Sequence, residues 1–580
     1  MYNKLIADIF SEIAALLSID EVHNSMFEVR AYQKAALTIG TMQEPIEEIY
    51  ANGGKEALQK LPGIGSTLAD RIIEYIKTGK IQKYEELKRK YPIDIKGLTS
   101  IEGIGAKKAI SLYKNLGIKD INDLKKAISE HKISKLPGFG EQSEALIKKG
   151  IDLLEKSKGR MLLGDIFPVA ERIVNDLISS RLVKNAIIAG STRRMRETIG
   201  DIDILAISDY PEKVMDYFTN MADVYDIISK GPTKTTVWLK IGISCDLRVI
   251  EPESFSAALL YFTGSKEHNI SIRKIAIKKG YKLNEYGLFS RGKKLPVKDE
   301  ASIYDKLGMQ YIPPEMREDR GEIKLALEHK IPNLIELKDI KGDLHTHTID
   351  SDGANTIEEM ASSAISHGLS YIATTNHTKS LKVAHGLDEK RFQKFFEKVD
   401  KLNSAYEGFH IFKGAEVDIL KDGSLDLSKT LLKSMDIVIC SIHSYFNMGE
   451  DEITNRVLKA FDTGLVDIFA HPTGRVIFER EAYKINLEKI FEAAEKNNII
   501  MEINSFPNRL DLSDTNIMMA SKYNIKFSID SDSHRTSHFD FLRYGVGTAR
   551  RGWLQKDNVI NTLTLEEMEK FVKNRQSHKF

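Results

Sequence analysis

The sequence predicts a multidomain protein with a helical N-terminal region, an α+β middle region and a C-terminal parallel β/α barrel or sheet. Residues 1–160 have a helical pattern with few strand signals, and short β-branched runs begin near residue 185. After about residue 341, strand-like apolar runs alternate with helical segments. The chain has 580 residues, too many for one hydrophobic core, so roughly three to five domains are expected.

The composition is that of a globular protein, with 42% hydrophobic and 29% charged residues. No apolar run approaches the roughly 18 residues of a membrane span, so no membrane association is predicted. Residues 1–20 carry Asp8 and Glu12 within their apolar pattern, which indicates an amphipathic helix and not a cleaved signal. Two cysteines, Cys245 and Cys440, cannot form a disulfide framework, which favours a cytoplasmic location.

Charge and histidine are distributed unevenly. Residues 1–320 contain 50 basic and 44 acidic residues, and the remainder has an acidic excess. This mild asymmetry permits nucleic-acid contact by the first part and metal binding by the second. Ten of the 15 histidines lie between residues 345 and 538. Because histidine is the commonest metal ligand, metal chemistry is predicted there.

Three related glycine turns punctuate the helical region, at residues 61–65, 101–105 and 136–140. Each precedes a helix-forming stretch, so backbone N–H groups at a helix start can hold a phosphate. For one copy, a turn that needs glycine for geometry alone is an equal alternative, but three copies favour helix-hairpin-helix modules that bind the DNA backbone. The predicted DNA-contacting glycines are Gly63, Gly65, Gly103, Gly105, Gly138 and Gly140.

A carboxylate cluster is predicted in the middle region. Asp201 and Asp203 are two apart in a strand and therefore face the same side. They stay ionised together at low cost only with a divalent cation between them, and hard oxygen ligands suit Mg²⁺. Asp246, in a later strand, adds a third carboxylate. A bare Asp-x-Asp is by default a solvated edge strand, but the preceding Gly-Ser-x-Arg-Arg and Asp246 favour two Mg²⁺ ions acting on a 3′-hydroxyl and a triphosphate.

The segment GSTRRMRETIGDIDILAI (190–207) resembles the nucleotidyltransferase motif of family X DNA polymerases. YFTGSKEHNISIRKIA (261–276) is similar to that family's thumb segment, and the resemblance covers residues 1–315, including a fingers-like SKGPTKTT (229–236). It implies Asp201, Asp203 and Asp246 as catalytic metal ligands. It also implies a nucleotide-binding set, with Arg273 on the DNA minor groove. That set is Gly190, Ser191, Arg194, Gly200, Tyr261, Phe262, Gly264 and Asn269.

Three positions depart from that family's pattern. Lys266 stands where some relatives carry an acid near the nucleotide base, so nucleotide affinity is expected to differ. Ser244 replaces an arginine before the third aspartate. Arg71 occupies the position of the lysine that forms a Schiff base in lyase-active relatives. Because a guanidinium stays protonated, no Schiff-base lyase activity of the usual strength is predicted.

The C-terminal region carries a second set of predicted metal ligands. His345 and His347 lie two apart on one strand face, and seven further candidates follow near strand ends. These are Asp352, His377, Glu416, His443, His471, Asp532 and His534. Imidazole with carboxylate suits Zn²⁺, Mn²⁺ or Fe²⁺ better than Mg²⁺, and nine ligands suffice for three ions that hydrolyse a phosphoester. Core or surface roles are predicted for the isolated His367, His385, His410 and His538.

Residues of about 340–570 resemble the PHP (polymerase and histidinol phosphatase) domain, a distorted seven-stranded β/α barrel. The resemblance implies three metal groups: His345, His347, Glu416 and Asp532; Glu416, His443 and His471; Asp352, His377 and His534. It also implies Arg475 and Arg509 as phosphate-side arginines. Asn376 replaces the usual Asp before His377, which is expected to weaken the orientation of that histidine and the nuclease activity.

The order of regions resembles the bacterial and archaeal family X polymerases. It predicts a helical 8-kDa-like domain (1–90), fingers (91–160), palm (161–250), thumb (251–315), linker (316–340) and a PHP phosphoesterase domain (341–580). The resemblance implies short-gap filling on gapped or primer–template DNA with deoxynucleoside triphosphates. It further implies metal-dependent removal of 3′-terminal nucleotides or 3′-phosphates, or cleavage at abasic sites.

The cofactors implied are two Mg²⁺ in the palm and up to three Mn²⁺ or Zn²⁺ in the barrel, in a monomer. Two alternatives remain. One is a transferase acting on a small molecule or protein, because the Gly-Ser and Asp-x-Asp motif is shared widely. The other is a DNA-end scaffold with a structural barrel.

Overall fold

The computed structural model describes residues 2–17, 26–42, 46–99, 101, 104–156 and 159–578. The chain forms two compact units. Unit 1 is Met1–Lys158 with Phe478–Arg480, and unit 2 is Gly159–Ile477 with Glu481–Phe580. Gly103, one of the predicted DNA-contacting glycines, lies outside the described residues. Among the described residues, no helix has the length and apolar character required to span a membrane.

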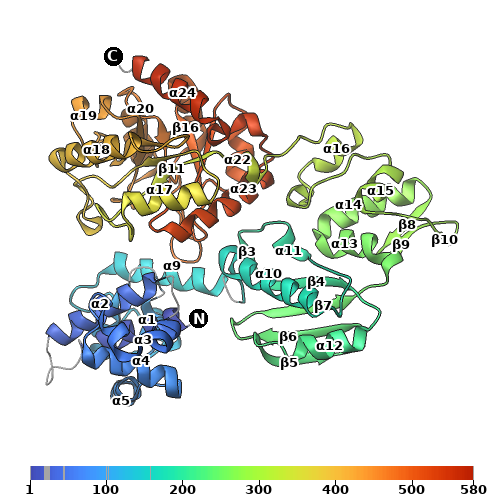
Figure 1. The fold of residues 1–580 in the computed structure, drawn as a ribbon, viewed down its shortest axis with the longest axis horizontal. Coiled ribbons are helices and arrows are strands. Elements are labelled where there is room, and N and C mark those ends of the chain that lie inside the picture. The colour runs from blue at the N-terminus through green and yellow to red at the C-terminus, as the bar shows by residue number, and fades with distance from the viewer. Residues whose placement is uncertain are drawn as a thin grey trace. The chain divides into compact units, whose positions relative to one another are not determined.

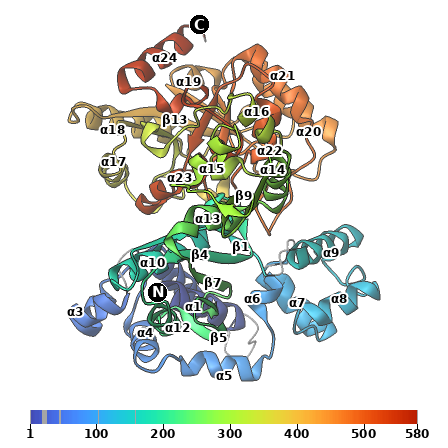
Figure 2. The same cartoon turned by 90° about the vertical axis from the view of Figure 1, so that its right-hand side faces the viewer.

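In unit 1, the regular elements of the described residues before 158 are all helices (Figure 1). Its helices are α1 (Tyr2–Leu17), α2 (Met26–Thr41), α3 (Ile46–Gln59), α4 (Ser66–Thr78), α5 (Gln82–Lys90), α6 (Ile95–Thr99), α7 (Ala106–Leu116), α8 (Ile121–Ser129) and α9 (Glu141–Lys156). The predicted amphipathic first helix is confirmed, since Ile6, Phe10 and Ile13 are buried in the core of this unit. Figure 2 shows α6 to α9 grouped together.

The three glycine turns join α3 to α4, α6 to α7 and α8 to α9. Gly63 and Gly138 both have φ of 81°, a left-handed conformation that L side chains rarely adopt. Gly65 and Gly105 are the extended N-cap residues of α4 and α7, with no side-chain cap. The sequence therefore places glycine where the chain reverses and leaves N–H groups at the helix starts without a side-chain partner.

The palm region of unit 2 is a five-stranded sheet in the order β2-β4-β7-β6-β5. Its elements are β1 (Met161–Leu162), α10 (Leu163–Ser179), β2 (Asn185–Ile188), α11 (Gly190–Arg193), β3 (Thr198–Ile199), β4 (Asp201–Ile207), α12 (Pro211–Thr219), β5 (Val224–Lys230), β6 (Lys234–Leu239) and β7 (Ser244–Val249). The segment 229–236 corrects the expected fingers-like character, because it ends β5, turns and begins β6 within this sheet.

The thumb region follows with η1 (Pro252–Ser254), α13 (Phe255–Thr263), α14 (Lys266–Lys278), β8 (Tyr281–Asn284), β9 (Gly287–Ser290), β10 (Lys293–Lys294), α15 (Glu300–Lys306), η2 (Pro314–Met316) and α16 (Glu322–Leu327). Much of the expected linker 316–340 packs into the thumb. Met316 and Ala326 belong to the thumb core, and the fully buried Arg317 pairs with Glu300 at 2.6 Å. The prolines and charged residues of this segment predicted a connector. That composition did not reveal that Met316, Arg317 and Ala326 are buried.

The C-terminal region is a seven-stranded parallel sheet whose strands follow in chain order. They are β11 (Gly342–Thr346), β12 (Tyr371–Thr374), β13 (His410–Asp418), β14 (Ile437–Ser441), β15 (Ile468–Phe469), β16 (Ile500–Asn504) and β17 (Phe527–Asp530). A parallel bridge between Thr346 and Ser533 joins the first and last strand ends, so the sheet is a nearly closed barrel. The predicted distorted barrel is confirmed.

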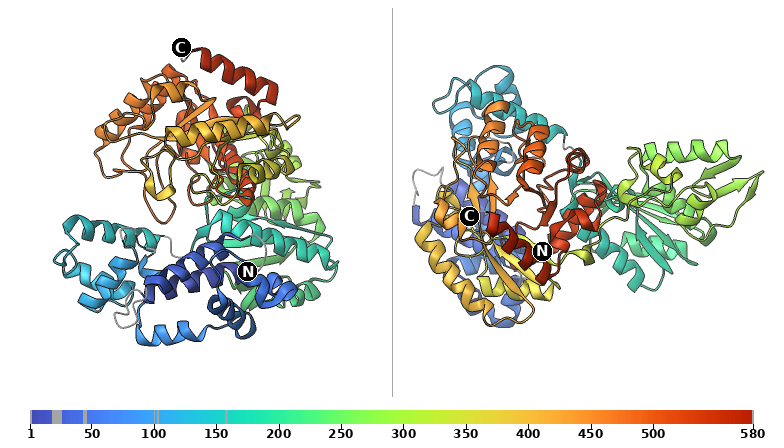
Figure 3. Two further views of the ribbon diagram at one scale, coloured as in Figure 1. Left: turned by 60° about the vertical axis from the view of Figure 1, so that its left-hand side comes forward. Right: turned by 90° about the horizontal axis from the view of Figure 1, so that it is seen from above.

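The barrel helices lie outside the strands (Figure 3). They are η3 (Leu337–Asp339), α17 (Ile357–Ser366), η4 (Lys382–Ala384), α18 (Glu389–Asn403), α19 (Lys429–Lys433), α20 (Glu450–Phe461), α21 (Leu487–Asn497), α22 (Asp514–Ala520), η5 (Thr536–Phe541), α23 (Leu542–Arg551), η6 (Lys556–Asn558), η7 (Ile560–Thr562) and α24 (Leu565–His578). Helix α23 also packs on the palm. Its Tyr544, with Leu510 from a barrel loop, is buried in the palm core.

Candidate active sites

The palm brings three carboxylates to one strand edge. Strands β4 and β7 are parallel and in register, so that Asp203 lies opposite Asp246 while Asp201 begins β4. Asp246 accepts a hydrogen bond from the Thr236 hydroxyl at 2.6 Å, and the Lys234 ammonium lies 3.0 Å from its other oxygen. Burial, with the charges of Asp201 and Asp246, raises the pKa of Asp203 to about 7. The cluster is therefore costly to ionise without a cation.

Gly190 lets the Gly-Ser turn lie against this cluster. Its φ is 62°, and a Cβ atom there would stand 2.3 Å from a carboxylate oxygen of Asp203. Any larger residue would push the carboxylate away or unwind α11. The turn therefore holds Ser191 directly beside the acids.

A pocket of about 560 Å³ opens beside these carboxylates. Ten of the predicted residues line it: Gly190, Ser191, Arg194, Asp201, Asp203, Tyr261, Phe262, Gly264, Asn269 and Arg273. Gly200 and Asp246 are outside this lining; a Cβ on Gly200 would meet the Arg160 guanidinium at 3.1 Å. Sequence reasoning missed Arg160 and Glu318, which also line the pocket. Both lie outside the quoted motifs, so no local pattern marked them.

Arg194, the arginine predicted to bind a triphosphate, already has partners within the protein. Arg194 pairs with Glu318 at 3.1 Å and donates to the Thr263 carbonyl at 2.5 Å. Burial lowers the pKa of Arg194 despite its partner Glu318. A triphosphate must therefore replace or share these partners.

The barrel brings the other eight predicted ligands together around one carboxylate, Glu416. One oxygen of Glu416 lies 3.4 Å from His345 Nε2 and 3.6 Å from His347 Nε2. Those two nitrogens lie 3.5 and 3.2 Å from the same oxygen of Asp532. The four side chains of the first predicted group thus converge.

The other two groups converge as well. The second oxygen of Glu416 lies 3.3 Å from His443 Nε2 and 2.9 Å from His471 Nε2. One oxygen of Asp352 lies 3.4 Å from His377 Nε2 and 3.5 Å from His534 Nε2. None of the four histidines predicted to be isolated joins the ligand clusters found among the described residues.

These side chains fit divalent metal ions. Ligand atoms about 2.1 Å from one ion stand roughly 3.0–3.4 Å from one another, close to the spacing within the three groups. The inward Nε2 atoms of His345 and His347 are buried without a hydrogen-bond partner. Burial opposes ionisation of Glu416, yet His377 and His443 hold its pKa well below the usual range. An anionic oxygen among unpartnered imidazole nitrogens is a donor set for cations.

Two further carboxylates orient the histidines. Glu502, on β16, lies 2.6 Å from His345 Nδ1 and accepts from the His471 backbone at 2.6 Å. Asp418 lies 3.0 Å from His443 Nδ1. Both fix the ring so that Nε2 faces the cluster. Sequence reasoning missed them, although an acid among the three apolar residues at the start of the strand IMEIN was a signal for Glu502.

Two barrel residues bond to partners that the sequence did not predict, and the expected effect of Asn376 on nuclease activity stays a prediction. Asn376 bonds to the loop that precedes Asp352, accepting from the Ser351 hydroxyl at 2.8 Å and the Thr348 N–H at 2.9 Å, instead of orienting His377. Arg475 turns to the palm, where it pairs with Glu197 at 2.7 Å. Its other hydrogens reach two carbonyls of the 506–511 loop. Asn376 and Arg475 each bond to a residue that is distant in sequence, so local sequence did not indicate the partner.

Arg509 does approach the cluster, with its Nε 3.8 Å from Asp532.

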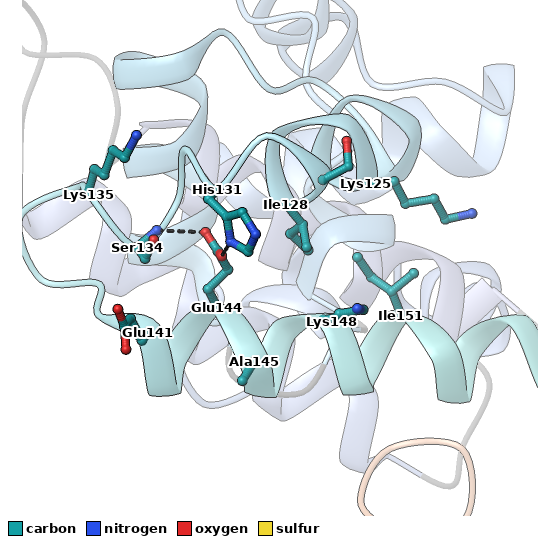
Figure 4. A pocket seen from close by; sticks show the side chains of 11 residues that line it. Lys125, Ile128, His131, Ser134, Lys135, Glu141, Glu144, Ala145, Lys148 and Ile151 are labelled. Atoms are coloured by element: carbon teal, nitrogen blue, oxygen red, sulfur yellow. Dashed lines mark hydrogen bonds and ion pairs between the residues drawn. The ribbon is translucent and has the colours of Figure 1, made fainter.

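In unit 1, a pocket of about 880 Å³ lies beside the third glycine turn (Figure 4). Lys125, Lys135 and Lys148 line it, while Glu144 anchors the turn by bonding the Ser134 N–H at 2.8 Å. This lysine-rich lining suits contact with a phosphate backbone.

Four family models match parts of the sequence. They are a helix-hairpin-helix domain at residues 1–81, a SAM-like helix-hairpin-helix tandem at 95–152, the DNA polymerase beta thumb at 258–318 and a PHP domain at 343–506. A probable phosphatase of Thermoanaerobacter sp. (strain X514) is 32% identical over 231 residues, which cover 38% of this chain and 89% of that protein. A probable phosphatase of Clostridium novyi (strain NT) is 31% identical over 237 residues.

A full-length relative is the DNA polymerase/3′-5′ exonuclease PolX of Bacillus subtilis (strain 168). It is 37% identical over 577 residues, which cover 99% of this chain and 100% of the relative. The predicted resemblance is thereby confirmed along both halves. The chain belongs to the family X DNA polymerases that carry a C-terminal PHP domain.

Proposed function

We propose that this protein fills short gaps in DNA at its palm and processes 3′ ends at its PHP barrel. The observation that carries the proposal is the presence of two separate clusters of cation ligands. One is made of three carboxylates beside a pocket of about 560 Å³, and the other of nine imidazole and carboxylate groups. Oxygen-only ligands suit Mg²⁺, and mixed ligands suit Mn²⁺ or Zn²⁺.

In the palm, Asp201, Asp203 and Asp246 would hold two Mg²⁺ ions. When bound, these ions supply activation of a primer 3′-hydroxyl and neutralisation of triphosphate charge. The protein itself positions the substrate. Ser191 and Arg194 grip the triphosphate, with Gly190 and Gly200 giving the backbone room.

The thumb side of the same pocket would select the sugar and the base pair. Tyr261, Phe262 and Gly264 line it near the sugar, and Asn269 donates to the Tyr261 carbonyl at 2.7 Å, which ties the two segments together. Arg273 follows one helical turn after Asn269 and would reach the minor groove. The glycine turns, apart from the undescribed Gly103, would hold the DNA backbone.

In the barrel, the nine imidazole and carboxylate groups around Glu416 would hold up to three Mn²⁺ or Zn²⁺ ions. When bound, the ions supply a nucleophile from water at neutral pH and stabilise the leaving oxygen. Glu502 and Asp418 keep the ligand rings oriented. Arg509 is the candidate for holding the phosphate, since Arg475 is paired elsewhere. We include 3′-phosphates and abasic sites among its substrates.

The test is a time course on a gapped duplex with a labelled 3′ end, with and without nucleotides, in Mg²⁺ and then Mn²⁺. Asp203→Ala should abolish extension and keep Mn²⁺-dependent nucleotide release. His345→Ala should do the opposite, so each variant is the matched control of the other. No extension by wild type would favour the transferase alternative. No release by wild type would favour a structural barrel.

We also propose that Schiff-base lyase activity is weak. Arg71 pairs with Glu74 at 2.9 Å, which keeps its guanidinium protonated. Reductive trapping of the protein on abasic DNA should give no covalent complex. A complex that forms in wild type and survives Arg71→Gln would place the amine elsewhere. A monomeric state and a cytoplasmic location complete the proposal.

A further inference from the structure

A second pocket lies inside unit 2, at the seam between palm, thumb and barrel. Its volume is about 210 Å³, room for about seven water molecules. Residues 195–197 of the palm loop form one wall, Arg320 from the end of the thumb another, and barrel residues the rest. No residue of either ligand cluster is in its lining, so the pocket is distinct from both clusters.

The lining carries a surplus of positive charge. Four guanidinium groups face only two carboxylates, those of Glu197 and Asp514. The guanidinium groups belong to Arg196, Arg320, Arg475 and Arg551. Arg475 pairs with Glu197 at 2.7 Å, and Arg551 with Asp514 at 2.6 Å. These pairs neutralise both acids.

The surplus therefore falls on Arg196 and Arg320. Arg320 shares Asp514 with Arg551, at 3.0 Å, and Arg196 stands 3.6 Å from Glu318 outside the lining. Their side chains are 37% and 28% exposed, against 4% for Arg551. Two partly exposed guanidinium groups over fixed ion pairs can turn toward an anion without leaving a buried charge unpaired.

The rest of the lining indicates the class of anion. The hydroxyls of Ser513 and Thr515, 3.0 Å apart, lie in the pocket with that of Thr548. Met195 is the one apolar side chain among the described lining residues, and no aromatic ring is among them. Guanidinium and hydroxyl donors suit phosphate oxygens, whereas a base or sugar has no apolar face to bind.

We propose that this seam pocket binds a small inorganic phosphate-class anion, pyrophosphate or phosphate. Arg196 lines both this pocket and the nucleotide pocket. Glu318, the partner of Arg194, also accepts from Arg551 at 2.9 Å. The site therefore adjoins the place where a triphosphate would release its leaving group. Binding itself does not depend on the proposed function, but the assignment of the anion's source rests on it.

The test is calorimetric titration of the full-length protein in a chelator, with inorganic pyrophosphate in one arm and inorganic phosphate in the other. Arg320→Gln and Thr515→Val change residues that line only the seam pocket. Arg320→Gln should weaken binding about tenfold or more, because it removes a charge-assisted contact. Thr515→Val, a nearly isosteric change, should weaken it several-fold while circular dichroism and thermal midpoint stay unchanged.

Two control variants separate the pocket from its surroundings. Arg543→Gln breaks another palm–barrel pair, with Glu171 at 2.6 Å, without touching the pocket, and should leave binding unchanged. Ser191→Ala lines only the nucleotide pocket and should also leave it unchanged. The proposal is overturned if wild type binds neither anion at millimolar concentration. It is also overturned if Thr515→Val binds like wild type, or if Arg543→Gln or Ser191→Ala loses binding as well.

The two arms identify the source. Tighter binding of pyrophosphate would assign the site to the polymerase product, and tighter binding of phosphate to a product of the barrel. Gap filling is measured on the same samples. A protein that binds the anion but does not fill gaps would contradict the proposed function and leave the site standing.

Discussion

The three palm carboxylates store repulsive free energy when no cation is bound, and Asp203 carries most of it. Burial and its two acidic neighbours raise its pKa from 3.8 to about 7. Each tenfold change in proton affinity corresponds to about 1.4 kcal/mol, so the full effect is about 4 kcal/mol. Asp203 is partly exposed, and solvent screening reduces the value to about 2 kcal/mol. We predict that Asp203→Asn stabilises the metal-free protein while destroying polymerase activity.

The raised pKa of Asp203 determines how the stability difference between Asp203→Asn and wild type depends on pH. The penalty is absent below pH 3.8, where the carboxyl is protonated in both folded and unfolded chains, and it is complete above about pH 7. In a chelator at pH 8, Asp203→Asn should raise the thermal midpoint of unit 2 by about 2 °C. The gain should shrink as the pH falls toward 5. In millimolar Mg²⁺ the wild type should have the higher thermal midpoint of the two proteins, because the cation stabilises only the intact cluster.

Scanning calorimetry with and without Mg²⁺ makes the measurement. Asp209→Asn is the matched control, because this exposed palm aspartate has only a surface pair with Lys184 at 2.6 Å. It should change stability by less than about 0.5 kcal/mol. An Asp203→Asn protein that is no more stable than wild type in the chelator at pH 8 would refute the electrostatic reasoning.

Three further variants test single contacts. Gly190→Ala places a Cβ 2.3 Å from the Asp203 carboxylate at a φ of 62°. Primer extension should be lost, and the free energy of unfolding should fall by about 1–3 kcal/mol. Normal extension would contradict this geometry. Glu502→Gln should weaken Mn²⁺ binding about 10–100-fold, measured as metal content after dialysis, with extension unchanged as its control. Arg551→Met removes one cationic partner from two partly buried carboxylates, Glu318 and Asp514, and should lower the free energy of unfolding in urea by about 3–5 kcal/mol. An unchanged unfolding midpoint would show that Arg551 does not anchor the barrel to the palm.

Local periodicity predicted the parts of both sites that lie on single strands. Asp201 and Asp203, and likewise His345 and His347, are two residues apart, and the backbone geometry of a strand alone makes such side chains converge. The barrel ligands were predictable because parallel strands deliver their carboxyl ends to one rim. The fold class followed from the same periodicity, and the seven strands follow one another in chain order.

Contacts between residues that are distant in sequence could not be predicted from local periodicity. Glu502 orients a histidine that lies 157 positions earlier, and Arg475 pairs with a palm residue 278 positions away. Nothing in the immediate neighbourhood of either residue encodes those contacts. The same limit explains Asn376, whose amide is used by the loop that carries Asp352 and not by the adjacent histidine.

The seam also bears on how the two activities can be separated. Leu510 and Tyr544 come from the barrel but are buried in the palm core, and Arg551 donates to the Arg194 carbonyl at 2.8 Å. A palm freed of its barrel would expose that apolar surface and lose a support beneath Arg194, the arginine proposed to bind the triphosphate. Loss of polymerase activity after deletion of the barrel would therefore reflect a damaged palm, whatever the barrel's own chemistry. Point changes inside each ligand cluster, which leave Tyr544 and Arg551 in place, are the variants that can assign each reaction to its site.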